Sequence, residues 1–316
     1  MIRPLFWSIL AAMAVYAGGV VFTDLGGVGE SVVRLNLAGW VVILALSLFN
    51  YGIRFVRWEF YLHRLSSRIS TLRSLAYYLG GFAFTTTPGK AGEAVRSLYL
   101  KRHGVAYVHS LAAFFTERFV DLVAMVLLAL FAALAFPEYR QPVLLIAVII
   151  VVLLPLIHLR SVHGFLERRL RKLPSEKVRV AGMKFLGLLG SSSLLLRSGT
   201  LFAGVALALV AWGAEGVAFH VILGALALET SLELTIGIYS VSVLAGALSF
   251  IPGGLGSTEA VMILLLKLIG ADTSTAVAAT LICRVATLWF AVMIGCFALV
   301  AVELGGKSAR FQAPSL

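Results

Sequence analysis

The sequence predicts an all-α polytopic membrane protein, built as a single transmembrane domain over residues 1–316. The first observation is a series of long apolar runs. Several of them, such as 122–136, 143–159 and 285–302, reach or approach the ~20 residues that a helix needs to cross a bilayer. The second observation is composition, because only 13% of the residues are charged and 60% are hydrophobic. Lipid offers the backbone no hydrogen bonds, so the spanning elements should be helices.

Taken in order, the apolar runs predict about six full spans and two broken ones. The full spans cover about residues 5–23, 38–60, 108–135, 142–159, 200–224 and 273–303. Segment 74–103 is interrupted at Pro88-Gly89, and segment 234–270 is interrupted at "PGGLG". Residues 160–198 are predicted to form a basic cytoplasmic loop. Its "FLERRLRKL" is typical of a surface helix that touches anionic lipid, and a partner-binding helix is the alternative.

The basic residues indicate the orientation. The net charge is +11, and the Lys and Arg residues concentrate in alternate loops, which marks the cytoplasmic side. This alternation holds if both broken segments are re-entrant hairpins, one entering from the cytoplasm and one from outside. A full span followed by an interfacial helix is the alternative for each. We therefore expect a multi-pass protein of the cell inner membrane with both termini cytoplasmic. Topology and anionic head groups explain the positive charge, so we expect no nucleic acid as a partner.

An internal repeat links the two broken segments. "PGKAGEAV" at 88–95 and "PGGLGSTEAV" at 252–261 both begin with Pro-Gly and end with Glu-Ala-Val. Glu93 precedes Arg118 by 25 residues, and Glu259 precedes Arg284 by the same distance. We predict inverted repeats over about 74–135 and 234–303, an arrangement typical of transporters with broken helices. The residues that break the helices are Pro88, Gly89, Gly92, Pro252, Gly253, Gly254 and Gly256.

Charged residues in and after these motifs are the candidate site. A helix that begins inside the membrane has unpaired N–H groups and a partial positive charge at its start, which suits an anion. Ser257 and Thr258 are possible N-caps of the second such helix. Because charges are costly in lipid, they should pair or face a polar cavity. We predict a central site for an anionic head group; ion pairs that only lock helices together are the alternative. The residues are Glu93, Glu117, Arg118, Asp121, Glu259 and Arg284.

Other charges are given smaller roles. Arg54 and Arg57, near the end of span 38–60, are interpreted as topology signals, although contacts to lipid phosphates are possible. Glu215 and His220 are interpreted as packing or minor cavity contacts. Cys283 and Cys296 lie 13 residues apart, too far along one helix to bridge, and two thiols without a His cluster make no metal site. We therefore expect neither a metal nor a cofactor.

The motifs resemble the two signature regions of the lysylphosphatidylglycerol synthase transmembrane-domain family, also called flippase-like membrane proteins. "TPGKAGEAVRSLYLKRHGV" with "TERFVDL", and "SFIPGGLGSTEAV", carry the resemblance, which covers most of the chain. It adds Lys90 to the candidate site. It implies a protein that moves or handles lipids: a phospholipid, a polyprenyl-phosphate-linked lipid or a hopanoid. The family's synthases also have a soluble aminoacyl transferase domain. This sequence ends soon after its last span, so we expect a stand-alone member without synthase activity.

The expected function is transport of an anionic or phosphate-bearing lipid between leaflets, with membrane lipids as partners. No ATP-binding motif is present, so movement would be downhill, proton-coupled or driven by a partner. One alternative is an enzyme that transfers a group to a lipid head group, with Glu93 or Asp121 as the acid or base. Another is a non-catalytic partner that holds a lipid-modifying enzyme through residues 160–198. A homo-oligomer is also possible.

Overall fold

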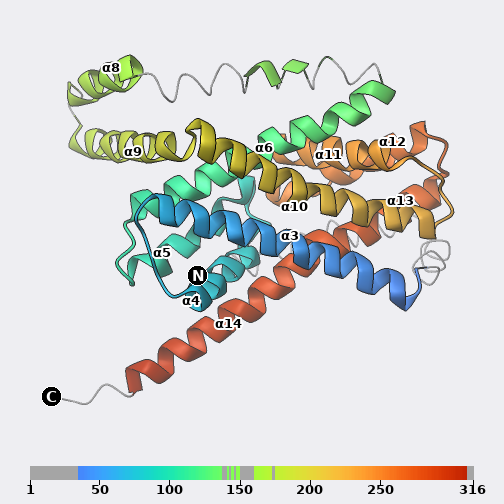
Figure 1. Cartoon of the computed structure of the whole chain (residues 1–316), viewed down its shortest axis with the longest axis horizontal. Coiled ribbons are helices and arrows are strands. Elements are labelled where there is room, and N and C mark those ends of the chain that lie inside the picture. Colours follow the sequence, from blue (N-terminus) through green and yellow to red (C-terminus); the bar gives the residue numbers. More distant parts are fainter. Residues whose placement is uncertain are drawn as a thin grey trace.

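The protein is a bundle of helices (Figure 1). The computed structural model describes residues 35–136, 141, 144–145, 147–149, 160–172 and 175–311. Within these residues the regular structure is helical throughout, with no strand, which confirms the predicted class. The elements are α3 (Leu37–Arg64), α4 (Thr71–Gly81), η1 (Phe82–Phe84), η2 (Pro88–Val95), α5 (Arg96–Lys101), α6 (Tyr107–Ala135), α8 (Arg160–Arg171), α9 (Glu176–Leu195), α10 (Ser198–Ala225), α11 (Leu232–Leu248), η4 (Pro252–Gly254), α12 (Ser257–Leu268), α13 (Thr273–Arg284), η5 (Val285–Trp289) and α14 (Phe290–Phe311).

Four helical stretches of the described chain are long and apolar enough to cross a membrane. They are Leu37–Arg64, Val178–Leu195, Ser198–Ala225 and Thr273–Leu304. The first, third and fourth match the predicted spans 38–60, 200–224 and 273–303. Predicted span 108–135 is one continuous helix, α6. Predicted span 5–23 and most of 142–159 lie outside the described residues, so the count of six spans stays a prediction.

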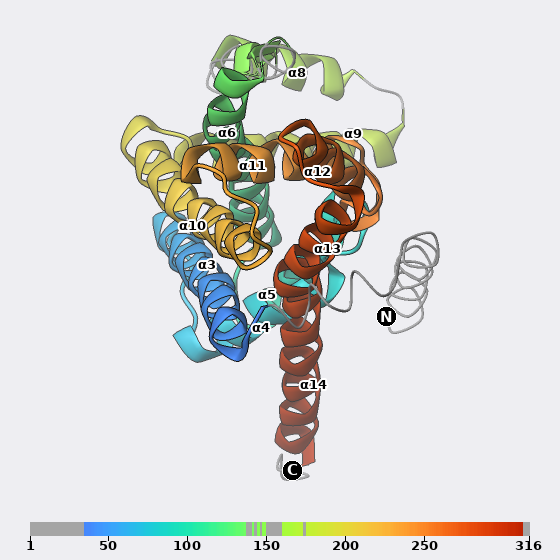
Figure 2. The same ribbon diagram turned by 90° about the vertical axis from the view of Figure 1, so that its right-hand side faces the viewer.

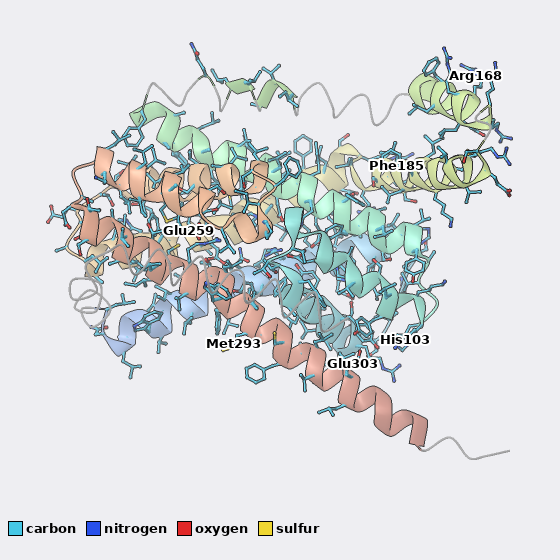
Figure 3. The ribbon with its side chains drawn as sticks, turned by 180° about the vertical axis from the view of Figure 1, so that it is seen from behind. His103, Arg168, Phe185, Glu259, Met293 and Glu303 are labelled. Atoms are coloured by element: carbon cyan, nitrogen blue, oxygen red, sulfur yellow. The ribbon has the colours of Figure 1, made fainter. Side chains whose placement is uncertain are left out.

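Residues 160–198, predicted as a basic loop, are largely helical. α8 contains most of the predicted surface helix, with Arg168, Arg169 and Arg171 in its last turn. The second helix, α9, was not predicted. The basic residues of its first half led to the prediction of a loop, although its second half is apolar. It packs against both α6 and α8. Figure 3 shows Arg168 and Phe185 on these two helices, at the side of the molecule opposite Glu259.

The apolar core lies between α3, α6, α10 and α11. α10 packs along α3, and α11 packs along α6; Figure 2 shows both pairs side by side. Small buried residues such as Ala132 and Ala208 let the backbones approach closely, as is usual between membrane helices. At Gly237 of α11 even a methyl group would collide with the backbone of Ala132. The core therefore fixes α6, which carries Glu117, Arg118 and Asp121 of the candidate site.

The two broken segments meet each other. After α4 the chain passes through η1, a turn at 85–87 and the 3₁₀ helix η2 before α5 begins. After α11 it passes through η4, where Gly253, Gly254 and Gly256 have φ of 63°, 65° and 86°, values that glycine adopts without steric cost. η2 and η4 are in contact, and a methyl group on Gly253 would lie 3.5 Å from Cα of Thr86. Motifs far apart in sequence therefore share one place in the fold.

The last long helix changes its winding directly after Arg284. Residues Val285–Trp289 form a π-helical turn, η5, a feature often found at functional sites. α14 then packs along α4 and η1, and Tyr99 of α5 donates a 2.7 Å hydrogen bond to Glu303. Figure 3 shows Glu303 close to His103, which follows α5. These contacts hold α14, which follows Arg284 in the chain, against the first broken segment.

Candidate functional site

Ten charged side chains gather around the place where the two motifs meet. Eight of them are at most 7% exposed, and Arg118 and Glu259 are slightly more open. An isolated charge in such surroundings is very unfavourable, and here the formal charges cancel. The five arginines are Arg54, Arg57, Arg96, Arg118 and Arg284, and the five carboxylates are Glu93, Glu117, Asp121, Glu215 and Glu259.

In the first motif region, Glu93 and Arg118 form an ion pair. Their Oε2 and Nη2 atoms lie 3.8 Å apart, and Thr85 donates a 3.1 Å hydrogen bond to Oε1 of Glu93. Arg118 also contacts Asp121, one turn further along α6, with 3.0 Å between Nη2 and Oδ2. The guanidinium is therefore held between two carboxylates, while 18% of its side chain stays exposed.

In the second motif region, Glu259 and Arg284 form the equivalent pair. Nε of Arg284 donates to Oε1 of Glu259 at 2.7 Å, and its Nη2 donates to the carbonyl of Gly253 at 2.7 Å. The other carboxylate oxygen of Glu259 accepts from the backbone N–H of Gly256 at 2.7 Å. Arg284 thus ties the positive-φ segment to α12. In both regions the arginine binds the glutamate 25 residues before it.

The start of α12 differs from the prediction. Gly256 is the N-cap, and Ser257 and Thr258, predicted as possible caps, are the first two helical residues. Ser257 donates to the carbonyl of Gly254 instead, at 3.1 Å. The reason is spacing: Glu259, three residues after Gly256, can reach back to its N–H, as glutamate does in a capping box. The chain's own carboxylate therefore occupies part of the anion seat that we expected at this helix start.

Glu117 and Asp121 are held by arginines from two other helices. Nη2 of Arg57 on α3 lies 2.6 Å from Oδ1 of Asp121 and 3.9 Å from Oε1 of Glu117. Arg96 of α5 donates to the other oxygen of Glu117. Trp212 of α10 donates to Oδ1 of Asp121 at 3.0 Å. Because Arg57 and Glu117 have fully buried side chains, this part of the cluster ties α3, α5, α6 and α10 together.

The prediction that Arg54 and Arg57 are topology signals is wrong for Arg57, which forms a buried ion pair, and the structure also buries Arg54. Both belong to a polar stripe on α3 with buried side chains at Ser47, Asn50, Arg54, Arg57 and Tyr61. Steps of three and four residues place such side chains on one helical face. This spacing is visible in the sequence, and it is the signal that would have identified a buried polar face.

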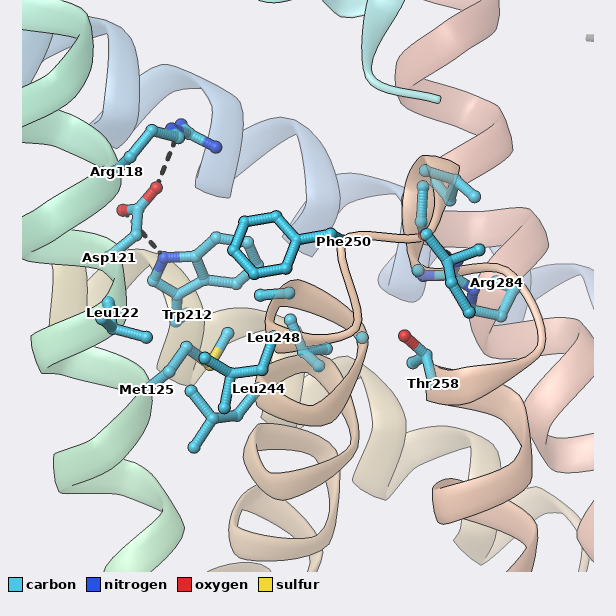
Figure 4. Close-up of a pocket in the computed structure, with 17 residues that line it drawn as sticks. Arg118, Asp121, Leu122, Met125, Trp212, Leu244, Leu248, Phe250, Thr258 and Arg284 are labelled. Carbon is cyan, nitrogen blue, oxygen red and sulfur yellow. Dashed lines mark hydrogen bonds and ion pairs between the residues drawn. The ribbon is translucent and has the colours of Figure 1, made fainter. Parts of the chain in front are cut away.

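A pocket of about 310 Å³ lies between Arg118 and Arg284, the arginines of the two arginine–glutamate ion pairs. Figure 4 shows Arg118, Asp121 and Trp212 on one side of it, Arg284 and Thr258 on the other, and Phe250 between them. The size falls at the lower end of the range for small-molecule sites. Most of the remaining wall is apolar: Leu122, Met125, Val243, Leu244, Ala247, Leu248, Ile251 and Leu288. A pocket with guanidinium groups on an apolar wall suits an amphiphile with a negative head.

A smaller cavity of about 50 Å³ shares Trp212, Val243, Arg284 and Leu288 with this pocket. Its wall is much more polar, and includes Glu215, which we had interpreted as a packing or minor cavity contact. The polar residues that line it are Tyr51, Arg54, Thr85, Glu93, Glu215, Tyr239, Arg284 and Thr287. Glu93 of the first motif and Arg284 of the second therefore face the same cavity.

The predicted site residues take different places. Arg118, Asp121 and Arg284 line the larger pocket, and Glu93 lines the smaller cavity. Glu117 and Glu259 bind the surrounding arginines. The side chain of Lys90 lies outside the described residues.

Comparison with known proteins supports one family. The family described as lysylphosphatidylglycerol synthase TM region matches residues 9–295, a range that contains both motifs and both of their arginines. A UPF0104 membrane protein of Methanothermobacter thermautotrophicus is 28% identical over 290 residues, covering 82% of this chain and 83% of the relative. Another from Pyrococcus horikoshii is 24% identical over 297 residues, covering 84% and 89%. A third, from Methanocaldococcus jannaschii, is 28% identical over 229 residues, covering 70% and 94%.

Proposed function

Because the chain belongs to the lysylphosphatidylglycerol synthase TM region family, we propose that this multi-pass integral membrane protein moves an anionic, phosphate-bearing lipid between the leaflets of the cell inner membrane, with both of its termini in the cytoplasm. One observation carries the proposal. Arg118 and Arg284, which follow the two repeated motifs, line the same largely apolar pocket. A guanidinium presents a rigid set of N–H donors that matches phosphate oxygens, so the pair forms a seat for a lipid phosphate.

The surroundings of the arginines support this role. Each arginine is paired with a carboxylate when no ligand is bound. Arg118 pairs with Glu93 and Asp121, and Arg284 pairs with Glu259. Neither positive charge is therefore isolated when the pocket holds no lipid. A phosphate can share these donors and does not have to replace water around a bare cation. The pocket of about 310 Å³ has room for a head group and the first carbons of a chain. The tails then remain in the bilayer.

The contact between η2 and η4 supports a transport route between the two repeats. In this proposal the repeats are inverted, and the two broken segments enter the membrane from opposite sides. Relative movement of the repeats then exposes the arginine-lined pocket first to one leaflet and afterwards to the other, as in other proteins with inverted repeats.

We expect Arg118→Gln and Arg284→Gln each to slow lipid movement about ten- to a hundredfold, since each loses hydrogen bonds to a charged group. The measurement is the rate at which fluorescent phosphatidylglycerol becomes accessible to a membrane-impermeant quencher in liposomes that contain the purified protein. Arg197→Gln, at an exposed arginine before α10, is the matched control and should behave as the wild type. Wild-type rates in both pocket variants, with unchanged gel-filtration profiles, would contradict the proposal. Covalent change of the labelled lipid would favour an enzyme.

A further inference from the structure

Arg54 is a buried arginine whose hydrogen bonds the described part of the protein does not complete. It lies in the middle of α3 and is 5% exposed. Its Nε and Nη2 atoms have no hydrogen-bond partner among the described residues. Its guanidinium lies over the rings of Phe82 and Trp212, at 5.3 and 5.4 Å from their centroids. Stacking of this kind leaves the N–H groups at the edge of the guanidinium free to bind an acceptor, and buried donors without acceptors are rare.

The cavity that Arg54 lines has the size of one small oxyanion. Its volume is about 50 Å³, and one water needs on the order of 10–15 Å³ of such space. About four oxygen-sized atoms therefore fit, which is the number in a tetrahedral phosphate group. The wall also carries the hydroxyl group of Tyr239, whereas the hydroxyls of Tyr51 and Thr85 already donate to the carbonyl of Thr287 and to Glu93. The cavity adjoins the larger pocket at Trp212 and Arg284.

We propose that Arg54 binds a phosphate-sized oxyanion with a single negative charge in this cavity, and that one proton enters the site with it. This inference deepens the proposed function and rests on it for the source of the oxyanion. The source is the phosphodiester of a lipid that passes from the seat between Arg118 and Arg284 into this adjoining cavity, so that its first chain carbons lie in the larger pocket. A free, soluble oxyanion with a single charge, such as a soluble phosphodiester or dihydrogen phosphate, has the same chemistry and is the other possible source.

The proton follows from charge balance. Arg284 is paired with Glu259 and Glu93 with Arg118, and the formal charges of the whole cluster cancel. One added negative charge would be uncompensated where the dielectric is low. A proton on a carboxylate of the cavity wall, Glu93 or Glu215, restores neutrality, whereas a doubly charged phosphate monoester would need two. The other titratable or charged groups near these carboxylates are Tyr51, Arg54, Arg118, Tyr239, Cys283 and Arg284.

The binding test uses the full chain in detergent micelles and three probes: phosphatidylglycerol, diacylglycerol, which has the same tails without a phosphate, and dimethyl phosphate, a soluble phosphodiester. The readout is the apparent Kd from the rise in melting temperature, since a ligand that binds only the folded protein stabilises it. We expect phosphatidylglycerol to bind more tightly than diacylglycerol. Arg54→Gln should weaken the binding of phosphatidylglycerol about ten- to a hundredfold, while Arg64→Gln, at the exposed end of the same helix, should leave it unchanged.

The outcomes separate the sources of the oxyanion and the alternative occupant. Binding of both phosphodiester probes through Arg54 supports an oxyanion site that needs no tail, and binding of phosphatidylglycerol alone supports a head-group site. Equal Kd values for phosphatidylglycerol and diacylglycerol, or an unchanged Kd in Arg54→Gln, would mean that the cavity holds only water and would overturn the inference. Arg54→Lys keeps the charge without the fork of donors and should bind weakly too. If Arg54 were only structural, Arg54→Gln would lower the melting temperature without ligand but leave the Kd of phosphatidylglycerol unchanged.

The proton has its own readout. Between pH 5.5 and 7.5 a phosphodiester keeps its single charge, so uptake of one proton should weaken phosphatidylglycerol binding by up to about tenfold per pH unit as the pH rises. A Kd independent of pH would show that no proton enters. The transport assay is separate: binding that depends on Arg54 in a protein that moves no lipid would contradict the proposed function and leave this site standing. Lipid transport by the protein, together with unchanged phosphatidylglycerol binding in Arg54→Gln, would support the proposed function and overturn the inference about this site.

Discussion

Replacing Glu117 by Gln is expected to lower the free energy of unfolding by about 3–5 kcal/mol, the usual cost of removing one partner from a buried ion pair. Glu117 is fully buried and binds Arg96, which is itself 1% exposed and packs at 3.7 Å from the ring centroid of Trp58. Arg57 also lies 3.9 Å from Glu117. Gln keeps the shape of the side chain but no longer balances these charges, so Arg96 is left buried without its counter-ion.

The measurement is the loss of helical circular dichroism with rising denaturant in detergent micelles. Glu167→Gln is the matched control, because Glu167 pairs with Arg171 at 2.6 Å while 43% and 67% of the two side chains are exposed. Exposed pairs of this kind contribute at most about 1 kcal/mol. A Glu117 variant as stable as this control would show that the buried part of the cluster does not hold the helices together.

Gly254→Ala is expected to destabilise the protein by about 2–5 kcal/mol. Part of this is the left-handed conformation, φ 65°, which costs a residue with a Cβ about 1–2 kcal/mol. The rest is overpacking of about 1–3 kcal/mol. The new methyl group would lie 2.7 Å from Oγ1 of Thr258 and 2.9 Å from Cα of Gly246. Both neighbours line the larger pocket, so we also expect loss of lipid movement.

Gly253→Ala separates these two contributions. Gly253 has nearly the same conformation, φ 63°, but an added methyl group would find its nearest atoms at 3.5 Å, an ordinary contact distance. We therefore expect a cost of only about 1–2 kcal/mol, from backbone conformation alone. The same unfolding measurement applies to both variants. Equal losses for Gly253→Ala and Gly254→Ala would show that the close packing of η4 on α11 contributes nothing to stability.

These predictions divide the charged cluster into two parts with different roles. Glu117, Arg57 and Arg96 are enclosed by α3, α5 and α6, and none of them lines either pocket. Their substitution should act on stability first. Arg118 and Arg284 face the larger pocket, so their substitution should act on lipid handling first. The sequence left two alternatives, a lipid site and ion pairs that lock helices together. Arg118 and Arg284 suit the first alternative, and the buried ion pairs of Glu117 suit the second.

The sequence by itself determined the helical membrane class and the glutamate and arginine that recur with each motif. Class follows from hydropathy, because a backbone in lipid has few ways to complete its hydrogen bonds. Equal spacing after similar motifs singled out Glu93 with Arg118 and Glu259 with Arg284, and the cost of an unpaired charge in lipid indicated pairing within or across the repeats. The structure decided for pairing within each repeat. Both pairs are present in the structure. The inverted orientation of the repeats stays a prediction.

Only the tertiary structure decided which other residues join the cluster and where the cavities lie. Arg57 meets Asp121 and Arg96 meets Glu117 because α3, α5 and α6 pack in a particular arrangement, and residues on different helices carry no spacing signal. The role of Glu259 at the start of α12 depended in the same way on the local path of the chain around Gly256. Hydropathy and spacing act along one segment at a time, whereas a pocket is formed by side chains of several helices, and its shape depends on how closely their backbones can approach.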